Sequence, residues 1–283
     1  MPDWLVHLDR RWIFTATFLA VGIPTLLGLR FPEQPSKNVL DVYKAIEDLP
    51  AGSTVLLTLD FDPASEGELG PMASAFTRHC CEKKLKIVYL TLWDRGPSMI
   101  QKAIDIIRTE YPAMKYGQDY VNLGYKSGAQ GVIKNMGTNL RADFQADVEG
   151  TSLEKLPLTK SLHNLKDMRM IICVGAGSPG PKEWVQFGAA TYNLKAVAGA
   201  TGVQAPQLGP YIPTPLLGVL AAIKGAAEYE QALIEGYPHL KKIAKAQEGL
   251  RRMGPQFVAH LLIVGLIILG NIISFSQRRR ATP

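Results

Sequence analysis

Cysteine is scarce in this chain, which has three in 283 residues, too few for a fully paired disulfide framework. Cys80 and Cys81 are adjacent in a helical pattern, and Cys173 lies in an apolar run, so all three are expected in the core. The sequence also lacks internal repeats, low-complexity tracts and a dense basic stripe with interleaved aromatics. The last absence argues against nucleic acid as a partner.

Charged residues are missing from two long segments near the ends of the chain. Trp12–Leu29 and Phe257–Phe275 contain no Asp, Glu, Lys or Arg. Helices of these lengths span roughly 27–28 Å, close to the ~30 Å hydrocarbon core of a bilayer. The sequence therefore predicts one transmembrane helix at each end, residues 12–29 and 257–275, with a soluble domain at 30–256.

Basic residues gather beside the predicted spans, where lipid head groups would meet them. The tails at 1–11 and 276–283 are short and rich in arginine, and a basic juxtamembrane helix is expected at 240–253. The interface residues are Arg10, Arg11, Lys241, Lys242, Lys245, Arg251, Arg252, Arg278, Arg279 and Arg280.

Arginines on short tails resist translocation, whereas long domains cross largely regardless of charge. This favours both termini in the cytoplasm and the domain on the other side, although Lys and Arg also flank the spans on the domain side. No A-x-A-like cleavage site follows the first span, which continues into Gly28-Leu29-Arg30, so it is expected to be an uncleaved signal anchor.

The predicted spans also carry small and polar residues suited to helix contacts. Ala16 and Ala20 form a small-xxx-small pattern, and His260 and Asn271 are polar within the second span. Such residues are expected to face other helices rather than lipid. We therefore expect other membrane subunits, or further copies of this chain, as partners beside the bilayer.

Apolar, β-branched runs alternate with helical patterns in the central domain. This alternation predicts right-handed βαβ crossovers and a doubly wound, mostly parallel sheet of about five strands flanked by helices. Residues 216–235 are expected to form a helix, and residues 126–167 an irregular excursion with one short helix. The expected strands are residues 54–59, 86–92, 120–123, 168–174 and 195–200.

Ligands of open parallel sheets bind outside the carboxyl ends of the strands. Here those ends carry polar residues and a glycine-rich turn that follows the fourth expected strand. The candidate ligand-binding residues are Asp94, Asn122, Gly175, Gly177, Ser178 and Gly180, and Asp60 and Asp62 are the candidate catalytic residues.

The glycine-rich turn Gly175–Gly180 matches G-x-G-x-x-G between a strand and a helix, the setting of a phosphate cradle. Two prolines, Pro179 and Pro181, remove amide donors that phosphates would need. The turn also nearly matches the nucleophile elbow G-x-S-x-G, and Glu228, Glu230 or Glu235 and then His239 follow in hydrolase order. However, Pro179 cannot supply the oxyanion amide after Ser178. Anion or nucleotide binding at this turn stays open as an alternative.

Asp60-Phe61-Asp62 ends an apolar strand and resembles the D-x-D motif of haloacid-dehalogenase-like phosphatases. The resemblance covers about ten residues and implies a nucleophilic carboxylate, a second carboxylate and a magnesium ion. Pro63-Ala64-Ser65 departs from the family pattern, and no later paired-aspartate motif is visible. The simpler interpretation is that Asp60 and Asp62 cap the following helix or its loop.

His79-Cys80-Cys81 cannot form a metal site alone, because consecutive helical side chains point about 100° apart. The favoured hypothesis is a membrane-anchored structural or ligand-binding subunit of a larger membrane complex, without a complete catalytic constellation. The alternatives are a membrane-tethered, phosphatase-like hydrolase at Asp60 and Asp62 and an anion binder at Gly175–Gly180. No cofactor is evident, and Mg²⁺ is implied only by the hydrolase alternative.

Overall fold

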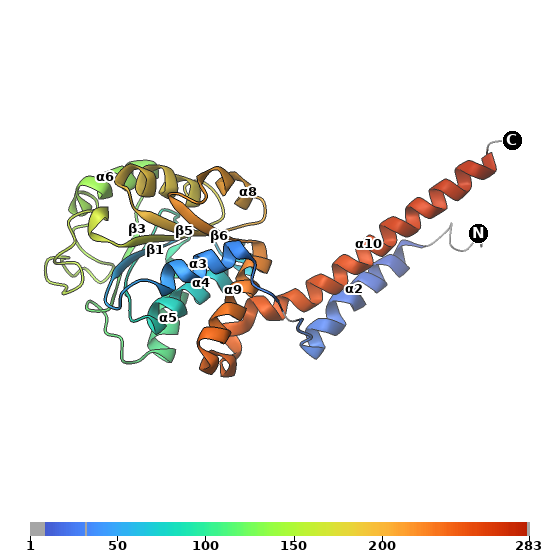
Figure 1. The fold of residues 1–283 in the computed structure, drawn as a ribbon, viewed down its shortest axis with the longest axis horizontal. Coiled ribbons are helices and arrows are strands. Elements are labelled where there is room, and N and C mark those ends of the chain that lie inside the picture. Colours follow the sequence, from blue (N-terminus) through green and yellow to red (C-terminus); the bar gives the residue numbers. More distant parts are fainter. Residues whose placement is uncertain (1–8, 32, 282–283) are drawn as a thin grey trace. The chain divides into compact units, whose positions relative to one another are not determined.

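A computed structural model describes residues 9–31 and 33–281 of the chain. It contains two compact units (Figure 1). The first comprises residues 33–249 and is an α/β domain. The second comprises the described residues up to 31 together with those from 250 onward, and it is helical.

The domain is built on a six-stranded sheet in which every neighbouring pair is parallel, in the order β3-β2-β1-β4-β5-β6. This confirms the predicted α/β class. Each expected strand is present, and the sheet has one strand more. The strands are β1 (Thr54–Asp60), β2 (Lys86–Thr91), β3 (Tyr120–Tyr125), β4 (Met170–Gly175), β5 (Lys195–Ala200) and β6 (Leu216–Ala221).

The sixth strand corrects the helix predicted for residues 216–235. β6 occupies Leu216–Ala221, and the helix α9 begins only at Ala222 and runs to Gly236. The run LLGVLA has no clear period, so its sequence fits a buried helix as well as a strand. Pairing decides between them, because β5 binds one edge of β6 and the Asn38 side chain binds the backbone of Val219 at the other.

Helices cover both faces of the sheet (Figure 1). One face carries α3 (Lys37–Glu47), α4 (Glu66–Glu82), α5 (Pro97–Glu110) and α9. The other carries α6 (Gln130–Thr138), α7 (Pro181–Glu183), the π-helix Trp184–Ala190 and α8 (Ala205–Leu208). Shorter 3-10 turns lie at Leu140–Ala142, Leu165–Asp167 and Gly209–Tyr211.

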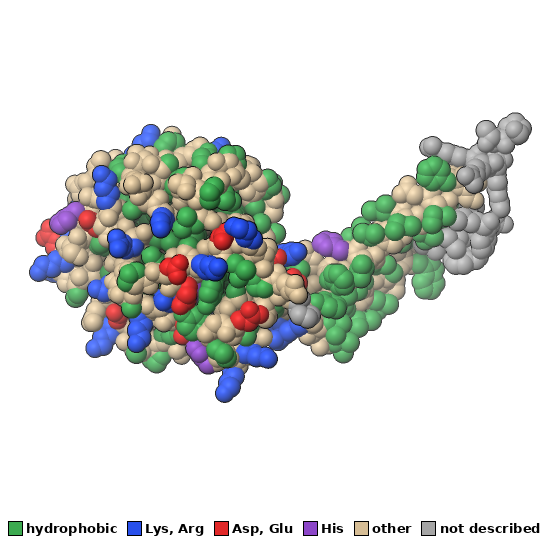
Figure 2. All heavy atoms as spheres, viewed as in Figure 1, with side chains coloured by type: hydrophobic (Ala, Val, Ile, Leu, Met, Phe, Trp, Pro, Cys, Tyr) green, Lys and Arg blue, Asp and Glu red, His purple; other side chains and the backbone are tan. Residues whose placement is uncertain are grey.

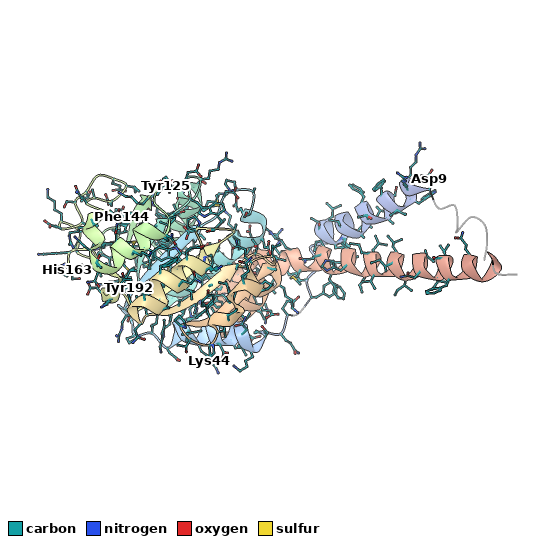
Figure 3. The ribbon with its side chains drawn as sticks, turned by 90° about the horizontal axis from the view of Figure 1, so that it is seen from above. Asp9, Lys44, Tyr125, Phe144, His163 and Tyr192 are labelled. Atoms are coloured by element: carbon teal, nitrogen blue, oxygen red, sulfur yellow. The ribbon has the colours of Figure 1, made fainter. Side chains whose placement is uncertain are left out.

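The irregular excursion predicted between α6 and β4 is bonded to β3 and to the loop before it. The Val148 N–H donates to the carbonyl of Asn122, and the Leu158 N–H donates to that of Gly117. Phe144 and His163 lie in this excursion and are labelled on the left of Figure 3.

The basic helix predicted at 240–253 is not formed as one element. Pro238–Lys242 and Ala244–Gln247 are 3-10 turns, and the long helix α10 begins at Glu248. Ile243 is extended between the two turns, and the Gln247 side chain donates to the Lys241 carbonyl at 2.7 Å. This side-chain bond holds a compact loop where residue propensity alone favours a helix.

The N-terminal helix α2 spans Arg10–Leu27, which corrects the predicted span 12–29. It ends at Gly28, whose φ of 59° is left-handed, and the Leu29 N–H returns to the Pro24 carbonyl as in a Schellman motif. Sixteen residues of α2 follow Arg10 and Arg11. A helix of sixteen residues is about 24 Å long, which is shorter than the ~30 Å hydrocarbon core of a bilayer.

Within the described part of the chain, the C-terminal helix is the one helix long and apolar enough to cross a membrane. α10 runs from Glu248 to Ala281 and contains the predicted span 257–275. Its side chains project outward along the helix, and apolar ones cover it (Figures 2 and 3). Those about half exposed or more are Phe257, Leu261, Ile263, Val264, Ile267, Ile268, Ile272 and Phe275.

The residues singled out on the two terminal helices differ in exposure. Ala16 and Ala20 are half-buried on α2, whereas His260 and Asn271 are exposed on α10. The predicted interface residues Arg10, Arg11, Lys241, Lys242, Lys245, Arg251 and Arg252 are exposed as well. Arg278, Arg279 and Arg280 belong to the end of α10, and their side chains lie outside the described part of the structure.

Candidate functional site

The strand order places a topological switch point at the centre of the sheet. β1 lies between β2 and β4, and the chain leaves β1 for one face of the sheet and β4 for the other (Figure 1). Ligands of doubly wound folds bind at this point. Here it brings together Asp60 from the end of β1, Trp93 from the loop after β2, and the turn Gly175–Gly180 after β4.

Asp60 is fully buried, and its carboxylate receives hydrogen bonds from two directions. The Leu92 N–H donates to Oδ1 at 2.6 Å, and the Trp184 indole N–H donates to Oδ2 at 2.7 Å. Burial raises the pKa of Asp60 to about 6, although these hydrogen bonds oppose the rise. The carboxylate therefore ties β1 to the loop after β2 and to the π-helix, and no substrate reaches it in this conformation.

Asp62 has a local partner as well. Its Oδ1 accepts the Ser65 N–H at 3.1 Å, in the turn that leads into α4. This agrees with the simpler interpretation of Asp62 as a turn residue. Among the residues that the structure describes, no group of three or more His, Cys, Asp or Glu side chains is placed to hold a metal ion.

The glycines of the turn after β4 are explained by close packing. A Cβ on Gly177 would lie 2.8 Å from the Trp93 ring, and one on Gly180 would lie 2.4 Å from the Gly177 carbonyl oxygen. Trp93 also donates its indole N–H to the Pro179 carbonyl at 2.6 Å. The turn therefore packs closely against the Trp93 ring, and Gly177 and Gly180 leave no room for a Cβ atom.

Two of the turn's amides, those of Ala176 and Gly180, already have partners. Glu183 accepts the Gly180 N–H at 2.9 Å and the Ser178 hydroxyl at 2.7 Å, and the Ala176 N–H donates to the Asp60 carbonyl. The carboxylate of Glu183 therefore occupies the position of an anion. A phosphate there would meet a negative charge, which disfavours it.

The serine-hydrolase constellation considered from the sequence is not assembled. The hydroxyl of Ser178 is bound to Glu183, and His239 pairs with Glu82 at 2.8 Å. Glu228 accepts the N–H and hydroxyl of Ser36, at the start of α3. The three types of group required for the chemistry therefore have separate structural partners.

The two remaining candidates lie farther along the same edge. Asp94 is exposed in the loop after β2. Asn122 is buried in β3, and its side-chain oxygen accepts the Gly124 N–H at 2.8 Å, so it closes the end of its own strand. The fold therefore places Asp60 beside the glycine turn, whereas Asn122 belongs to a different strand and binds its own backbone.

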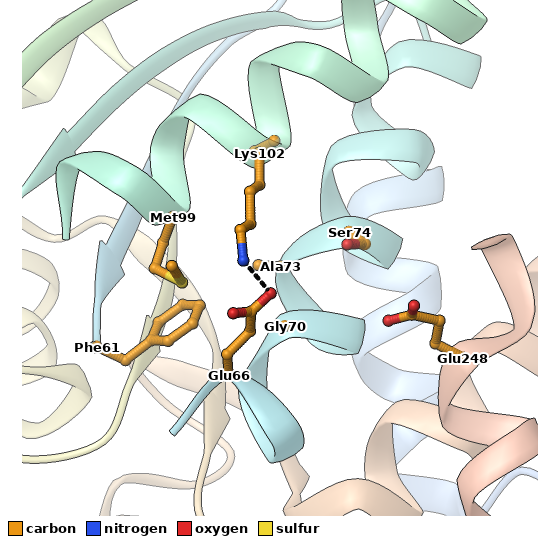
Figure 4. Close-up of a pocket in the computed structure, with 9 residues that line it drawn as sticks. Phe61, Glu66, Gly70, Ala73, Ser74, Met99, Lys102 and Glu248 are labelled. Carbon is orange, nitrogen blue, oxygen red and sulfur yellow. Dashed lines mark hydrogen bonds and ion pairs between the residues drawn. The ribbon is translucent and has the colours of Figure 1, made fainter. Parts of the chain in front are cut away.

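Two small cavities lie near this edge of the sheet. One, of about 40 Å³, has Phe61 and Met99 as apolar walls, and Lys102 is bonded to Glu66 at 2.5 Å across it (Figure 4). The other, of about 30 Å³, borders Ser178, Glu183 and Gln204. Each has room for a few water molecules. Neither accommodates an organic substrate in this conformation.

A buried polar chain, which the sequence did not predict, lies between α3, α4 and α9. Nε2 of His79 is 2.9 Å from the Glu47 carboxylate, and Nδ1 is 2.6 Å from the Tyr229 hydroxyl. Burial lowers the pKa of His79 to about 4, so the ring is neutral near pH 7. Its partners are 32 and 150 residues away, so no local sequence signal indicates the contact.

The three cysteines are free and buried, which confirms their expected place in the core. No family model matches this chain, and no curated protein is significantly similar to it. Its class is therefore defined by its own geometry: an α/β domain with a parallel six-stranded sheet, on a chain whose described part has one helix long and apolar enough to cross a membrane.

Proposed function

We propose that this protein is a membrane-anchored subunit of a larger membrane complex, in which the α/β domain has a structural or ligand-binding role. The observation that carries the proposal is the apolar surface of α10, which stays exposed among the residues that the structure describes. Its uncharged stretch from Met253 to Gln277 is about 38 Å long, more than the hydrocarbon core requires. A bilayer is the environment that removes this surface from water.

The short helix α2 is proposed as a second membrane segment beside α10. Trp12, Phe14 and Phe18 are each more than two thirds exposed, so α2 also presents an apolar surface. The two helices are joined near their domain-side ends, where the Phe31 and Phe257 rings are 4.9 Å apart. Local thinning of the bilayer, or snorkelling of Arg10 and Arg11, would accommodate a helix of this length.

The proposed partners are lipids and other membrane helices. Ala16 and Ala20 are small residues that permit close approach of another helix on α2. His260 and Asn271 are exposed on α10, where they offer hydrogen bonds to a neighbouring subunit or to a second copy of this chain. Helix contacts within the bilayer would therefore hold the subunit in its complex.

The proposed sidedness has an extracytoplasmic domain, because the arginines beside the outer ends of the two apolar helices, Arg10-Arg11 and Arg278–Arg280, favour the cytoplasmic side. Protease digestion of sealed, right-side-out vesicles tests it. A protease added outside is expected to cleave the domain while the vesicles are intact. Cleavage that begins only after the vesicles are opened would contradict this sidedness and place the domain in the cytoplasm.

A non-catalytic role is supported by the way the strand-end carboxylates are used. Asp60 is enclosed by its donors, Asp62 binds a backbone amide, and Glu183 fills the glycine turn. The hydrolase alternative has its own test. Magnesium-dependent hydrolysis of a phosphate ester that is lost in Asp62→Asn would favour the hydrolase alternative over this proposal.

Membrane anchoring is tested by introducing charge into α10. Val264→Asp and Ile267→Asp each place a carboxylate near the centre of the uncharged stretch, where it costs about 2.5–3.5 kcal/mol. We expect the double variant to leave the membrane fraction under conditions that retain the wild type. Val203→Asp is the matched control, because Val203 is 84 % exposed on the α/β domain. Retention of the double variant would contradict anchoring by α10.

The role as a subunit is tested by native mass after gentle detergent extraction. Reproducible co-purifying membrane proteins or a homo-oligomer are expected. His260→Leu and Asn271→Leu are expected to reduce the recovered complex while anchoring persists. A clean monomer from the native membrane would contradict the subunit proposal without affecting the membrane anchor.

A further inference from the structure

A large cavity lies at the opposite edge of the sheet from the switch point. Its volume is about 390 Å³, roughly ten times that of either cavity near the carboxyl edge. It lies where β1, β4 and β5 begin, and it is formed by three loops that precede those strands. The lining residues are Asp48, Leu49, Pro50, Lys166, Met168, Arg169, Asn193, Leu194 and Lys195.

The backbone holds the three loops together. The Arg169 N–H donates to the Thr54 carbonyl at 2.8 Å, and Met170 pairs with Lys195 in the sheet. Asn193 has a φ of 57°, the left-handed conformation that asparagine adopts more readily than most residues, and this turns the chain sharply into β5. The walls of the cavity are therefore set by the sheet itself.

The charge of the cavity is unbalanced. Lys166, Arg169 and Lys195 line it from two loops, and Asp48 is the single acidic residue in its lining. Among the side chains that the structure describes, none forms an ion pair with these three cations. By contrast, Lys102 in the small cavity of Figure 4 is neutralised by Glu66.

Three cations around one cavity, against the single carboxylate of Asp48, favour an anion that binds among them. A guanidinium and two ammonium groups match phosphate oxygens in charge and hydrogen bonding. Leu49, Pro50 and Leu194 add apolar walls that contact the organic part of a ligand. The volume lies within the range of small-molecule sites.

We propose that this amino-edge cavity, lined by Lys166, Arg169 and Lys195, binds the phosphate monoester of an organic molecule. The phosphate contacts the three cations, and the organic group lies against Leu49, Pro50 and Leu194. The source of the monoester is either a soluble metabolite or the head group of phosphatidic acid, and both present the same chemistry.

The test uses the full chain in neutral detergent and isothermal titration with phenyl phosphate and inorganic phosphate. Phenyl phosphate is expected to bind the more tightly, because its ring contacts the apolar walls. Arg169→Gln with Lys195→Gln is expected to weaken it at least about tenfold, since each removes a charge-assisted contact. Arg108→Gln with Lys155→Gln, an exposed Arg and Lys outside the cavity, is the matched control and should bind as the wild type does.

A second arm places the chain in phosphatidylcholine vesicles with and without phosphatidic acid. Competition by phosphatidic acid against phenyl phosphate in the wild type identifies the lipid head group as the source, and unchanged binding identifies a soluble ester. The proposal is overturned if neither probe binds the wild type. It is also overturned if the control variant loses as much affinity as the cavity variant, or if the cavity variant keeps its affinity.

Discussion

The indole N–H of Trp184 donates to Oδ2 of Asp60 across 2.7 Å and joins two residues 124 positions apart at the centre of the carboxyl edge. Both side chains are fully buried. Asp60 ends β1, and Trp184 opens the π-helix after the glycine turn. This bond therefore holds the turn against the central strand of the sheet.

Trp184→Phe is expected to lower the free energy of unfolding by about 1–3 kcal/mol, because it leaves a buried carboxylate oxygen without its donor. Trp93→Phe is the matched control. It removes an indole bond to the neutral Pro179 carbonyl at a half-buried position and should cost about 0.5–1.5 kcal/mol. Urea unfolding of both variants checks the order. A larger loss in Trp93→Phe would contradict the central role of the Asp60 bond.

Asp60 and His79 give opposite dependences of stability on pH in the same window. The pKa of Asp60 is raised by burial from 3.8 to about 6, so its contribution is complete below pH 4 and lost as the pH rises through 6. The pKa of His79 is lowered by burial from 6.5 to about 4, so its contribution is complete above pH 6.5 and lost as the pH falls through 4. Each effect amounts to about 3 kcal/mol, and the two largely cancel.

Substitution of either residue alone is expected to reveal the pH dependence of stability that the other one causes. Between pH 4 and 6.5, His79→Gln should lose about 3 kcal/mol of stability as the pH rises, relative to the wild type. Asp60→Asn should gain about the same amount over that range. Unfolding free energies of the three proteins across this range provide the comparison, since all other titrating groups are shared. Parallel profiles would show that neither group titrates as described.

The open edge of β6 depends on one side chain. Asn38 donates to the Val219 carbonyl at 2.7 Å and accepts the Val219 N–H at 3.2 Å, as a neighbouring strand would. Asn38→Ala is expected to cost about 1–3 kcal/mol, because two backbone groups lose their partner. Lys37→Ala, at the adjacent exposed position, should stay within about 0.5 kcal/mol. Equal urea midpoints for the two variants would contradict this role of Asn38.

A side chain at Gly180 is expected to destabilise the glycine turn. A Cβ there would lie 2.4 Å from the Gly177 carbonyl oxygen, and a backbone atom cannot move aside cheaply. Gly180→Ala should therefore cost about 1–3 kcal/mol in thermal or urea unfolding. Gly131→Ala, which has open space around it within α6, should be neutral or stabilise by about 0.5–1 kcal/mol. A neutral Gly180→Ala would show that the turn is not closely packed.

Several features of the site were within reach of the sequence. The buried strands at 54–59 and 168–174 are largely apolar runs, and their ends placed Asp60 and the glycine turn at one edge of a parallel sheet. The sequence did not reveal that Glu183 fills the turn or that Trp184 binds Asp60. Those contacts depend on how two helices and a loop pack, which no local pattern encodes.

Periodicity and hydropathy by themselves determined that this chain has a parallel α/β domain and an apolar C-terminal helix. Only the tertiary structure decided that Leu216–Ala221 is a strand, because β5 and Asn38 supply its backbone partners. It also decided that α2 stops at Leu27 and that Asp60 is enclosed rather than available. Local sequence limits the backbone conformations of a segment, whereas hydrogen-bond partners distant in the chain select among them.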